Sequence, residues 1–350
     1  MDAPLPLDTS LLDGLSFACR PDCGLCCFAS PRVEPAEAAA IRAARPDLSL
    51  VEIGRDRFLA ARPDGGACAL LADLRCTLHD RRPGPCREFP VTVHVGERLQ
   101  ATAVLSCPGL RWTEALVGRP VAPPASGAFG LEAELAAVRR RIGPPVRRRL
   151  EAAARRRRRI VRSLEDDGRW EEEDDVRAAL GRDLPMPRDG AFWPEDPPPE
   201  SDGLVSLPLF FDRRAGPVAI AAGVGGWKLL ELSAEGGVRA ELGTYPAPDR
   251  VPELEPAGRD LLRGYLAHWL ARDAFFGYAV LVAERSGSGS LREVAARELR
   301  AIGATALARA LLRARARRSG PYRLSAEDVA DGIRATDQDL LDRPTWGDRL

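Results

Sequence analysis

The sequence predicts an α+β protein with a small cysteine-rich domain, a charged helical segment, and a small antiparallel sheet followed by helices. All eight cysteines fall before residue 108, and arginines and acids separate into blocks between residues 131 and 181. Beyond residue 204, short alternating strands give way to helical patterns. The expected division is a cysteine domain over 1–116, a linker over 117–130, a charged helical segment over 131–184, a proline-rich linker over 185–203, and an α+β C-terminal domain of unknown role over 204–350.

The composition is that of a soluble globular protein. Of the 350 residues, 45% are hydrophobic and 29% are charged, and the formal net charge is zero. A neutral chain has no overall attraction to nucleic acid or to an anionic membrane. The sequence contains no run of about 20 apolar residues that could span a bilayer. The N-terminus lacks a basic and apolar signal sequence, so we expect a cytoplasmic protein with reduced thiols.

Short elements and many turns fill the first 112 residues. Residues 33–45 form a predicted helix, with Pro35 in the first turn and Pro46 at its end. Two short strands are expected on either side of Gly54, and Val91 begins an alternating pattern that predicts a hairpin. Residues 68–90, between these two strands and the hairpin, are rich in loops and carry three cysteines. So small a core needs a metal or a crosslink to hold it together.

Residues 131–181 are predicted to be helical and strongly segregated in charge. From Arg139 to Arg162 the chain has a net charge of +11, and from Glu165 to Asp175 it has a net charge of −7. The run Arg155–Arg159 could bind nucleic acid, or it could pair with the acidic block folded back beside it. No aromatic residue interleaves the arginines, so we favour pairing with Glu171–Asp175 over a nucleic-acid partner.

Strand and helix patterns follow one another in the C-terminal part. The stretches LVSLPLFF, PVAIAAG, WKLLELS and VRAELGTY predict a small antiparallel sheet. The glycines of AAGVGGWK indicate a hairpin turn, because they match neither of the phosphate-binding glycine patterns. The chain is predicted to be helical from about residue 255, and capping boxes at Ser290 and Ser325 begin two of the helices.

The cysteines are the strongest functional signal. Four lie within nine residues in CRPDCGLCC, and after the eighth the chain continues without any for more than two hundred residues. Thiolates are favoured ligands of zinc and iron, whereas disulfides are rare in the cytoplasm. The clustering argues against the remaining alternative, which is buried inert thiols. We therefore predict metal ligation by Cys19, Cys23, Cys26, Cys27, Cys68, Cys76, Cys86 and Cys107.

The number of metal centres stays open from the sequence. The first four cysteines and the last four could each hold one ion, or one multinuclear cluster could draw on both groups. Side chains of adjacent residues in an extended backbone point apart, so Cys26 and Cys27 could serve different centres. Gly24 is expected to supply the sharp turn that lets the neighbouring thiols converge.

Three other side chains stand near cysteines in the sequence. His79 follows Cys76 by three residues, which is a usable spacing for a zinc ligand, but eight thiols make it unnecessary. Arg82 and Arg87 flank Cys86. They could donate hydrogen bonds to cluster sulfurs, or they could form salt bridges that stabilise the fold.

Three segments together resemble a known family. FACRPDCGLCC, CALLADLRCTLHDRRPGPCREFP and SCPG are similar to the YkgJ-type cysteine-cluster family, also described as the CxxCxxCC zinc- or iron-chelating domain. All eight cysteines have counterparts, and the resemblance covers about residues 15–112. Three residues separate Cys19 from Cys23 where the family name implies two, which affects the geometry of the first ligand. The resemblance implies metal or iron–sulfur binding and no general reaction.

The sequence thus favours an iron–sulfur cluster over zinc, with a redox or enzyme-associated role. Eight cysteines suit thiolate-only clusters, whereas one structural zinc ion would leave four thiols unexplained. The alternative is a structural zinc-binding module that docks a protein or a nucleic acid. The sequence shows no catalytic triad and no carboxylate pair, and it leaves catalytic residues, substrate and partner unknown.

Overall fold

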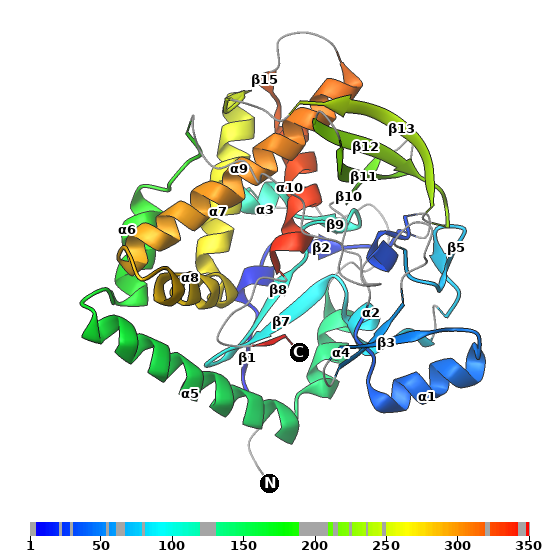
Figure 1. The fold of residues 1–350 in the computed structure, drawn as a ribbon, viewed down its shortest axis with the longest axis horizontal. Helices are drawn as coiled ribbons and strands as arrows, with labels where there is room; N and C mark the ends of the chain where they lie inside the picture. Colours follow the sequence, from blue (N-terminus) through cyan, green and yellow to red (C-terminus); the bar gives the residue numbers. More distant parts are fainter. Residues whose placement is uncertain are drawn as a thin grey trace.

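Helices and small sheets alternate along the chain in the computed structural model, which confirms the predicted α+β class (Figure 1). No helix in the described part of the chain is both long enough and apolar enough to cross a bilayer. The structure describes residues 5–20, 23–28, 31–53, 56–60, 67–78, 81–119, 131–188, 209–212, 216–223, 226–235, 237–246, 250–318, 323–341 and 348–349.

Short helices and strands make up the described part of residues 5–119. Pro35 opens the first helix as predicted, and Glu37 accepts a 3.2 Å hydrogen bond from the backbone amide of Glu34. The two strands near residue 54 pair antiparallel, and the hairpin that begins at Val91 is present. The elements are β1 (Leu7–Asp8), η1 (Ser10–Leu12), β2 (Ser16–Phe17), η2 (Leu25–Phe28), α1 (Pro35–Ala44), β3 (Leu50–Ile53), β4 (Asp56–Leu59), β5 (Leu71–Ala72), β6 (Arg75–Cys76), α2 (Gly84–Glu88), β7 (Val91–Val95), β8 (Leu99–Ala103), β9 (Leu110–Arg111) and α3 (Thr113–Leu116).

The charged segment and the C-terminal part also follow the predicted order. The charged segment contains α4 (Glu132–Arg141), α5 (Pro144–Asp166) and α6 (Glu173–Arg182). The C-terminal part contains β10 (Leu209–Asp212), β11 (Gly216–Gly223), β12 (Gly226–Leu232), β13 (Val238–Tyr245), β14 (Glu253–Leu254), α7 (Pro256–Ala271), α8 (Asp273–Ser286), α9 (Leu291–Arg317), β15 (Arg323–Leu324), α10 (Ala326–Leu341) and β16 (Asp348–Arg349).

The predicted C-terminal sheet and helix starts are confirmed. β10 to β13 form an antiparallel sheet in sequence order, in which β11 and β12 are the predicted hairpin. At the start of α9, Ser290 and Glu293 exchange hydrogen bonds between side chain and backbone amide. Ser325 and Asp328 do the same at the start of α10. These reciprocal bonds satisfy amides that the first helical turn leaves without partners.

A second four-stranded sheet, in the order β1-β8-β7-β16, brings segments from both ends of the chain to the hairpin (Figure 1). β1 runs parallel to β8, with Leu7 opposite Leu99. β16 runs antiparallel to β7, with Asp348 opposite Val95. The sequence did not predict these edge strands, because two-residue strands carry no alternating pattern.

One hydrophobic cluster extends across the hairpin and the C-terminal helices. It joins Val93 of β7 to buried side chains of α7, α8, α9 and α10. Tyr265, Trp269 and Phe275 belong to it, and the Trp269 ring contacts each of the other two rings edge to face. A second cluster surrounds the cysteines and includes Leu232 of β12. Hydrophobic contact therefore crosses the expected limit at residue 116, and the domain division itself stays a prediction.

A buried ion pair fixes the end of β8 to the C-terminal helices. Arg272 contacts Asp337 of α10 at 3.0 Å, and both side chains are fully buried. Asp337 also accepts a 2.8 Å hydrogen bond from the backbone amide of Leu105, just after β8. The Arg272 guanidinium lies over the Trp269 ring, 4.2 Å from its centre. The pair therefore positions the backbone two residues before Cys107.

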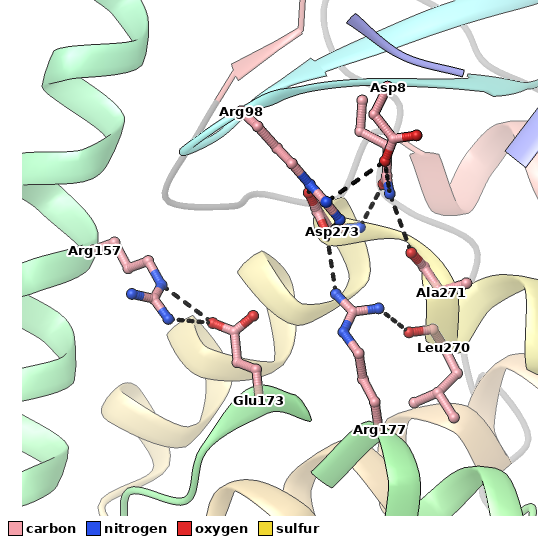
Figure 2. Close-up of polar contacts among 9 residues, drawn as sticks. Asp8, Arg98, Arg157, Glu173, Arg177, Leu270, Ala271 and Asp273 are labelled. Atoms are coloured by element: carbon pink, nitrogen blue, oxygen red, sulfur yellow. Dashed lines mark hydrogen bonds and ion pairs between the residues drawn. The ribbon is translucent and has the colours of Figure 1, made fainter. Parts of the chain in front are cut away.

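Only part of the arginine run pairs with the acidic block. Arg157 contacts Glu173 at 2.8 Å, which confirms the predicted pairing for this one arginine (Figure 2). Arg155 contacts Glu151 of its own helix at 3.9 Å. Among the described residues, the other three arginines of Arg155–Arg159 have no ion-pair partner. The expectation that this surface does not bind nucleic acid stays a prediction.

Next to this contact, Asp273 at the start of α8 joins three elements (Figure 2). Its carboxylate contacts Arg98, between β7 and β8, at 2.6 Å and Arg177 of α6 at 3.1 Å. Arg98 also lies 3.7 Å from Asp8 of β1. The first strand, the hairpin and the charged segment are thereby held to α8.

Replacing Asp337 by alanine tests the buried ion pair. The substitution leaves the charge of Arg272 buried without its partner, so we expect the free energy of unfolding to fall by about 3–5 kcal/mol. Chemical denaturation measures this change. Arg155→Gln is the matched control, because its pair is largely exposed and contributes little. Equal unfolding midpoints for the two variants would contradict the role given to the pair.

Candidate metal centre

Seven of the eight predicted ligands line one cavity of about 310 Å³. They come from the stretch that ends in η2, from the residues before β5, from β6 and from α2. The cavity walls also include the buried side chains of Leu59 and Leu70. The seven cysteines are Cys19, Cys23, Cys26, Cys27, Cys68, Cys76 and Cys86.

Pairing between β2 and β9 brings the backbone at Cys19 towards Cys107. The two strands are antiparallel, and beyond them the amide of Ala18 donates a 2.9 Å hydrogen bond to the carbonyl of Gly109. A Cβ at residue 109 would lie 2.2 Å from the carbonyl oxygen of Ala18, so glycine is required for this close approach. The first and last cysteines of the sequence are neighbours for this reason.

The predicted turn at Gly24 is confirmed. Its φ of +55° lies in the left-handed region that glycine adopts without strain. The amide of Cys27 donates a 2.9 Å hydrogen bond back to the carbonyl of Gly24, at the start of η2. A Cβ at residue 24 would lie 2.9 Å from Cδ1 of Leu71 and 3.0 Å from the carbonyl oxygen of Leu74. The turn therefore also packs against the β5–β6 hairpin.

Backbone hydrogen bonds connect the middle cysteines to η2. The amide of Cys68 donates to the carbonyl of Cys27 at 2.6 Å, and the amide of Leu71 donates to the carbonyl of Cys68 at 2.9 Å. Leu71 then pairs with Cys76 across the β5–β6 hairpin. Main-chain contacts thus hold together three cysteines that are far apart in the sequence.

Contacts with α1 and α4 hold α2, which carries Cys86. Glu37 of α1 accepts a 2.8 Å hydrogen bond from the first amide of α2 and a 3.0 Å hydrogen bond from Arg87. Arg141 of α4 contacts Glu88 at 2.6 Å. A five-residue helix is not stable by itself, so its position depends on these contacts. Sequence analysis missed Glu37, because no local pattern relates α1 to α2.

Three of the thiols share hydrogen bonds. A hydrogen bond with Cys27 lowers the pKa of Cys26 and lowers the pKa of Cys76 to about 6. The same hydrogen bonds, together with burial, raise the pKa of Cys27. The positive charge of Arg82 also favours the thiolate forms of Cys26 and Cys76 and so lowers the pKa of both. These two thiols are the most readily ionised of the group.

Burial favours the protonated form of four other cysteines. It raises the pKa of Cys23 to about 11 and also raises the pKa of Cys86 and Cys107, and the partial burial of the otherwise exposed Cys19 raises the pKa of that thiol as well. Removing a thiolate from water disfavours the charged form. All of these groups can ionise together only when a positively charged metal compensates the thiolates.

Cys26 lies within electrostatic reach of both halves of the cysteine set. Burial is the main cause that raises the pKa of Cys19, Cys86 and Cys107. The negative charge of a Cys26 thiolate raises the pKa of all three further. Cys27 is hydrogen-bonded to Cys76, which is one of the last four cysteines in the sequence. The spatial grouping therefore mixes the first four cysteines with the last four.

The two arginines predicted beside Cys86 differ in position. Arg82 lines the thiol cavity. The Arg87 side chain contacts Glu37 and the backbone carbonyl of Arg82. Hydrogen bonding of either arginine to a metal-bound sulfur stays a prediction. His79 lies outside the described residues.

Two further arginines of the cavity, Arg20 and Arg75, were not singled out by sequence analysis. Their one signal in the sequence is adjacency to Cys19 and Cys76. Guanidinium groups near thiols favour the thiolate, which is the form that binds metals. They are thus suited to compensate the charge of several thiolates.

The donor set fits zinc or iron in its chemistry. Thiols from several segments converge on one cavity, and arginines line it. Within the described ranges, no group of three or more His, Cys, Asp or Glu side chains is already arranged around a metal position. Ligation would require the hydrogen-bonded thiols of Cys26, Cys27 and Cys76 to release their protons.

Comparison with known families agrees with this chemistry. Residues 18–108 match the family model CxxCxxCC, described as "putative zinc- or iron-chelating domain". The match confirms the resemblance found in the sequence, and it spans all eight cysteines, from Cys19 to Cys107. No curated protein and no solved structure matches the chain. The cysteine region is thus similar to a metal-chelating domain, and the match leaves residues 109–350 unassigned.

Gly24→Ala tests whether the turn positions the thiols. Alanine at a positive φ costs about 1–2 kcal/mol, and its Cβ would also press on Leu71 and Leu74. We expect metal affinity, measured by competition with a chelator, to fall about tenfold, as for other changes that disturb ligand orientation. Gly168→Ala is the matched control: its φ is +66°, with no atom within 4 Å of the added Cβ. Equal metal affinity of the two variants would rule out the role of the turn.

Proposed function

We propose that the protein binds an iron–sulfur cluster of the YkgJ type through its eight cysteines, in the cytoplasm, in a redox or enzyme-associated role. The observation that carries the proposal is the convergence of seven cysteines on one cavity of about 310 Å³. A structural zinc ion takes four ligands, at about 2.3 Å for thiolates. One zinc ion would therefore leave at least three of the converging thiols without a function.

The interactions between Cys26 and the other cysteines favour one cluster over two zinc ions. Two closed zinc sites need two separate groups of four thiolates. Cys26, however, acts electrostatically on Cys19 and Cys107 as well as on Cys86. A cluster with several metal corners can accept thiolates from both sides of Cys26.

The protein's own residues would control access and charge at such a centre. Cys19 is exposed, while Cys23, Cys27, Cys68 and Cys107 are buried. The bound cluster supplies one-electron transfer or a substrate-binding iron. Arg20 and Arg82 place positive charge beside the sulfurs, which raises the reduction potential of a negatively charged cluster.

Anaerobic purification of the full-length protein tests the cofactor. The protein should be brown, should contain iron and acid-labile sulfide, and should lose its visible absorbance on reduction with dithionite. Cys23→Ser and Cys86→Ser should each remove or weaken the colour, because each removes a thiolate ligand. A colourless protein with near-stoichiometric zinc and no iron would contradict the proposal. It would support the alternative, a structural zinc module that docks a protein or a nucleic acid.

A further inference from the structure

Five exposed arginines lie along the outward side of α5, a helix at the edge of the molecule (Figure 1). The opposite side of this helix carries the buried Val146, Ala153, Ile160 and Leu164. Four of the arginines recur after seven, four and three residues, spacings that return to one side of a helix. From first to last they extend for about 21 Å, at 1.5 Å per residue. This arginine row comprises Arg148, Arg155, Arg158, Arg159 and Arg162.

Carboxylates compensate little of the positive charge of the arginine row. Between residues 147 and 162 the chain has one acidic residue, Glu151. It lies 3.9 Å from Arg155, and the two side chains are 59% and 62% exposed, so water screens the pair. Among the described residues, the other four arginines of the row have no ion-pair partner. Glu97 and Glu173, from other elements, contact α5 at Arg157, which lies outside the row.

The arginines of the row also repel one another. Arg155 and Arg159 are four residues apart, as are Arg158 and Arg162. Side chains at this spacing are neighbours on a helix, and like charges there destabilise the helix. Burial of the apolar side of α5 stabilises the helix against this repulsion. Carboxylates from a partner would convert the repulsion into attraction.

The residues of α5 discriminate among three kinds of anionic partner. The helix contains no aromatic side chain on which the bases of single-stranded nucleic acid could stack. Glu151 lies between Arg148 and Arg155, where it repels the continuous phosphates of a duplex. The apolar side of α5 is buried within the protein, so it is not free to enter a membrane surface. A protein segment can place carboxylates opposite the arginines and a different side chain opposite Glu151.

We propose that the arginine row is a docking surface for an acidic segment of a partner protein. Guanidinium groups bind carboxylates through paired N–H donors, and clusters of arginine are a recurring means of recognising acidic motifs. Arginines that recur at each turn or two of α5 match acidic residues that recur every three or four positions along a helix of the partner. The proposal goes beyond metal binding and does not depend on which metal the thiols hold.

Fluorescence anisotropy of a labelled peptide, titrated with the full-length protein at low ionic strength, tests this surface. The peptide has about 18 residues, with glutamates at every third or fourth position among alanines. We expect saturable binding of one peptide per chain, which weakens as salt is added. A matched peptide with glutamine in place of glutamate should bind at least about tenfold more weakly, because it lacks the charges of several ion pairs. A short duplex DNA and vesicles that contain phosphatidylserine, titrated in the same buffer, should also bind more weakly than the acidic peptide.

Variants of the full-length protein locate the surface, and circular dichroism shows whether each one folds. Arg159→Gln combined with Arg162→Gln should weaken binding of the acidic peptide by about threefold to tenfold, through the loss of two exposed ion pairs. Glu151→Gln removes the carboxylate within the row, so it should bind the peptide more tightly. Arg239→Gln combined with Arg323→Gln is the control, because it removes the same charge from exposed positions of β13 and β15, far from α5 (Figure 1). Metal content is measured in the same samples and should not change.

Three outcomes overturn the proposal. The first is the absence of saturable binding of the acidic peptide. The second is tighter binding of the DNA or of the vesicles, which would assign the surface to nucleic acid or to a membrane instead. The third is peptide binding that the pair of substitutions at Arg159 and Arg162 leaves unchanged, or that the control pair weakens to the same extent. Tighter binding by Glu151→Gln is the outcome that general damage to the fold cannot produce.

Discussion

The buried pair between Arg272 and Asp337 is the contact on which the cysteine site depends. The negative charge of a carboxylate that is buried away from water must be balanced by a positive charge or by hydrogen-bond donors. Asp337 has both, in the Arg272 guanidinium and the backbone amide of Leu105. Because Leu105 lies two residues after the end of β8 and two before Cys107, the position of α10 influences the path of the chain into Cys107. The cysteine region is therefore held in place partly by residues more than two hundred positions later in the chain.

The thiols converge through backbone contacts between segments that lie apart in the sequence. The β2–β9 pair, the turn at Gly24 and the β5–β6 hairpin fix where the main chain runs. Within that frame, the thiols are buried and hydrogen-bond to one another, which raises the pKa of Cys27 and Cys23 and lowers the pKa of Cys76. A metal bound by these thiols would replace their protons with a central positive charge.

Local patterns in the sequence predicted most elements and the identity of the donor groups. The helix at Pro35, the hairpin at Val91 and the caps at Ser290 and Ser325 were predictable because each depends on residues a few positions apart. The edge strands β1 and β16, the support of α2 by Glu37 and the Arg272–Asp337 pair were not. Each joins residues far apart in the chain, and no spacing rule relates them. For the same reason, the sequence could name the eight cysteines but could not show that Cys26 acts electrostatically on both an early cysteine, Cys19, and later ones, Cys86 and Cys107.

The central claim is that the converging cysteines hold one multinuclear centre. X-ray absorption spectroscopy at the metal edge of the full-length, anaerobically purified protein tests it most directly. The account predicts iron with sulfur as its only type of nearest neighbour, and further iron atoms in the next shell of scatterers. Zinc with four ligands and no neighbouring metal, or iron with mainly oxygen and nitrogen ligands, would contradict it.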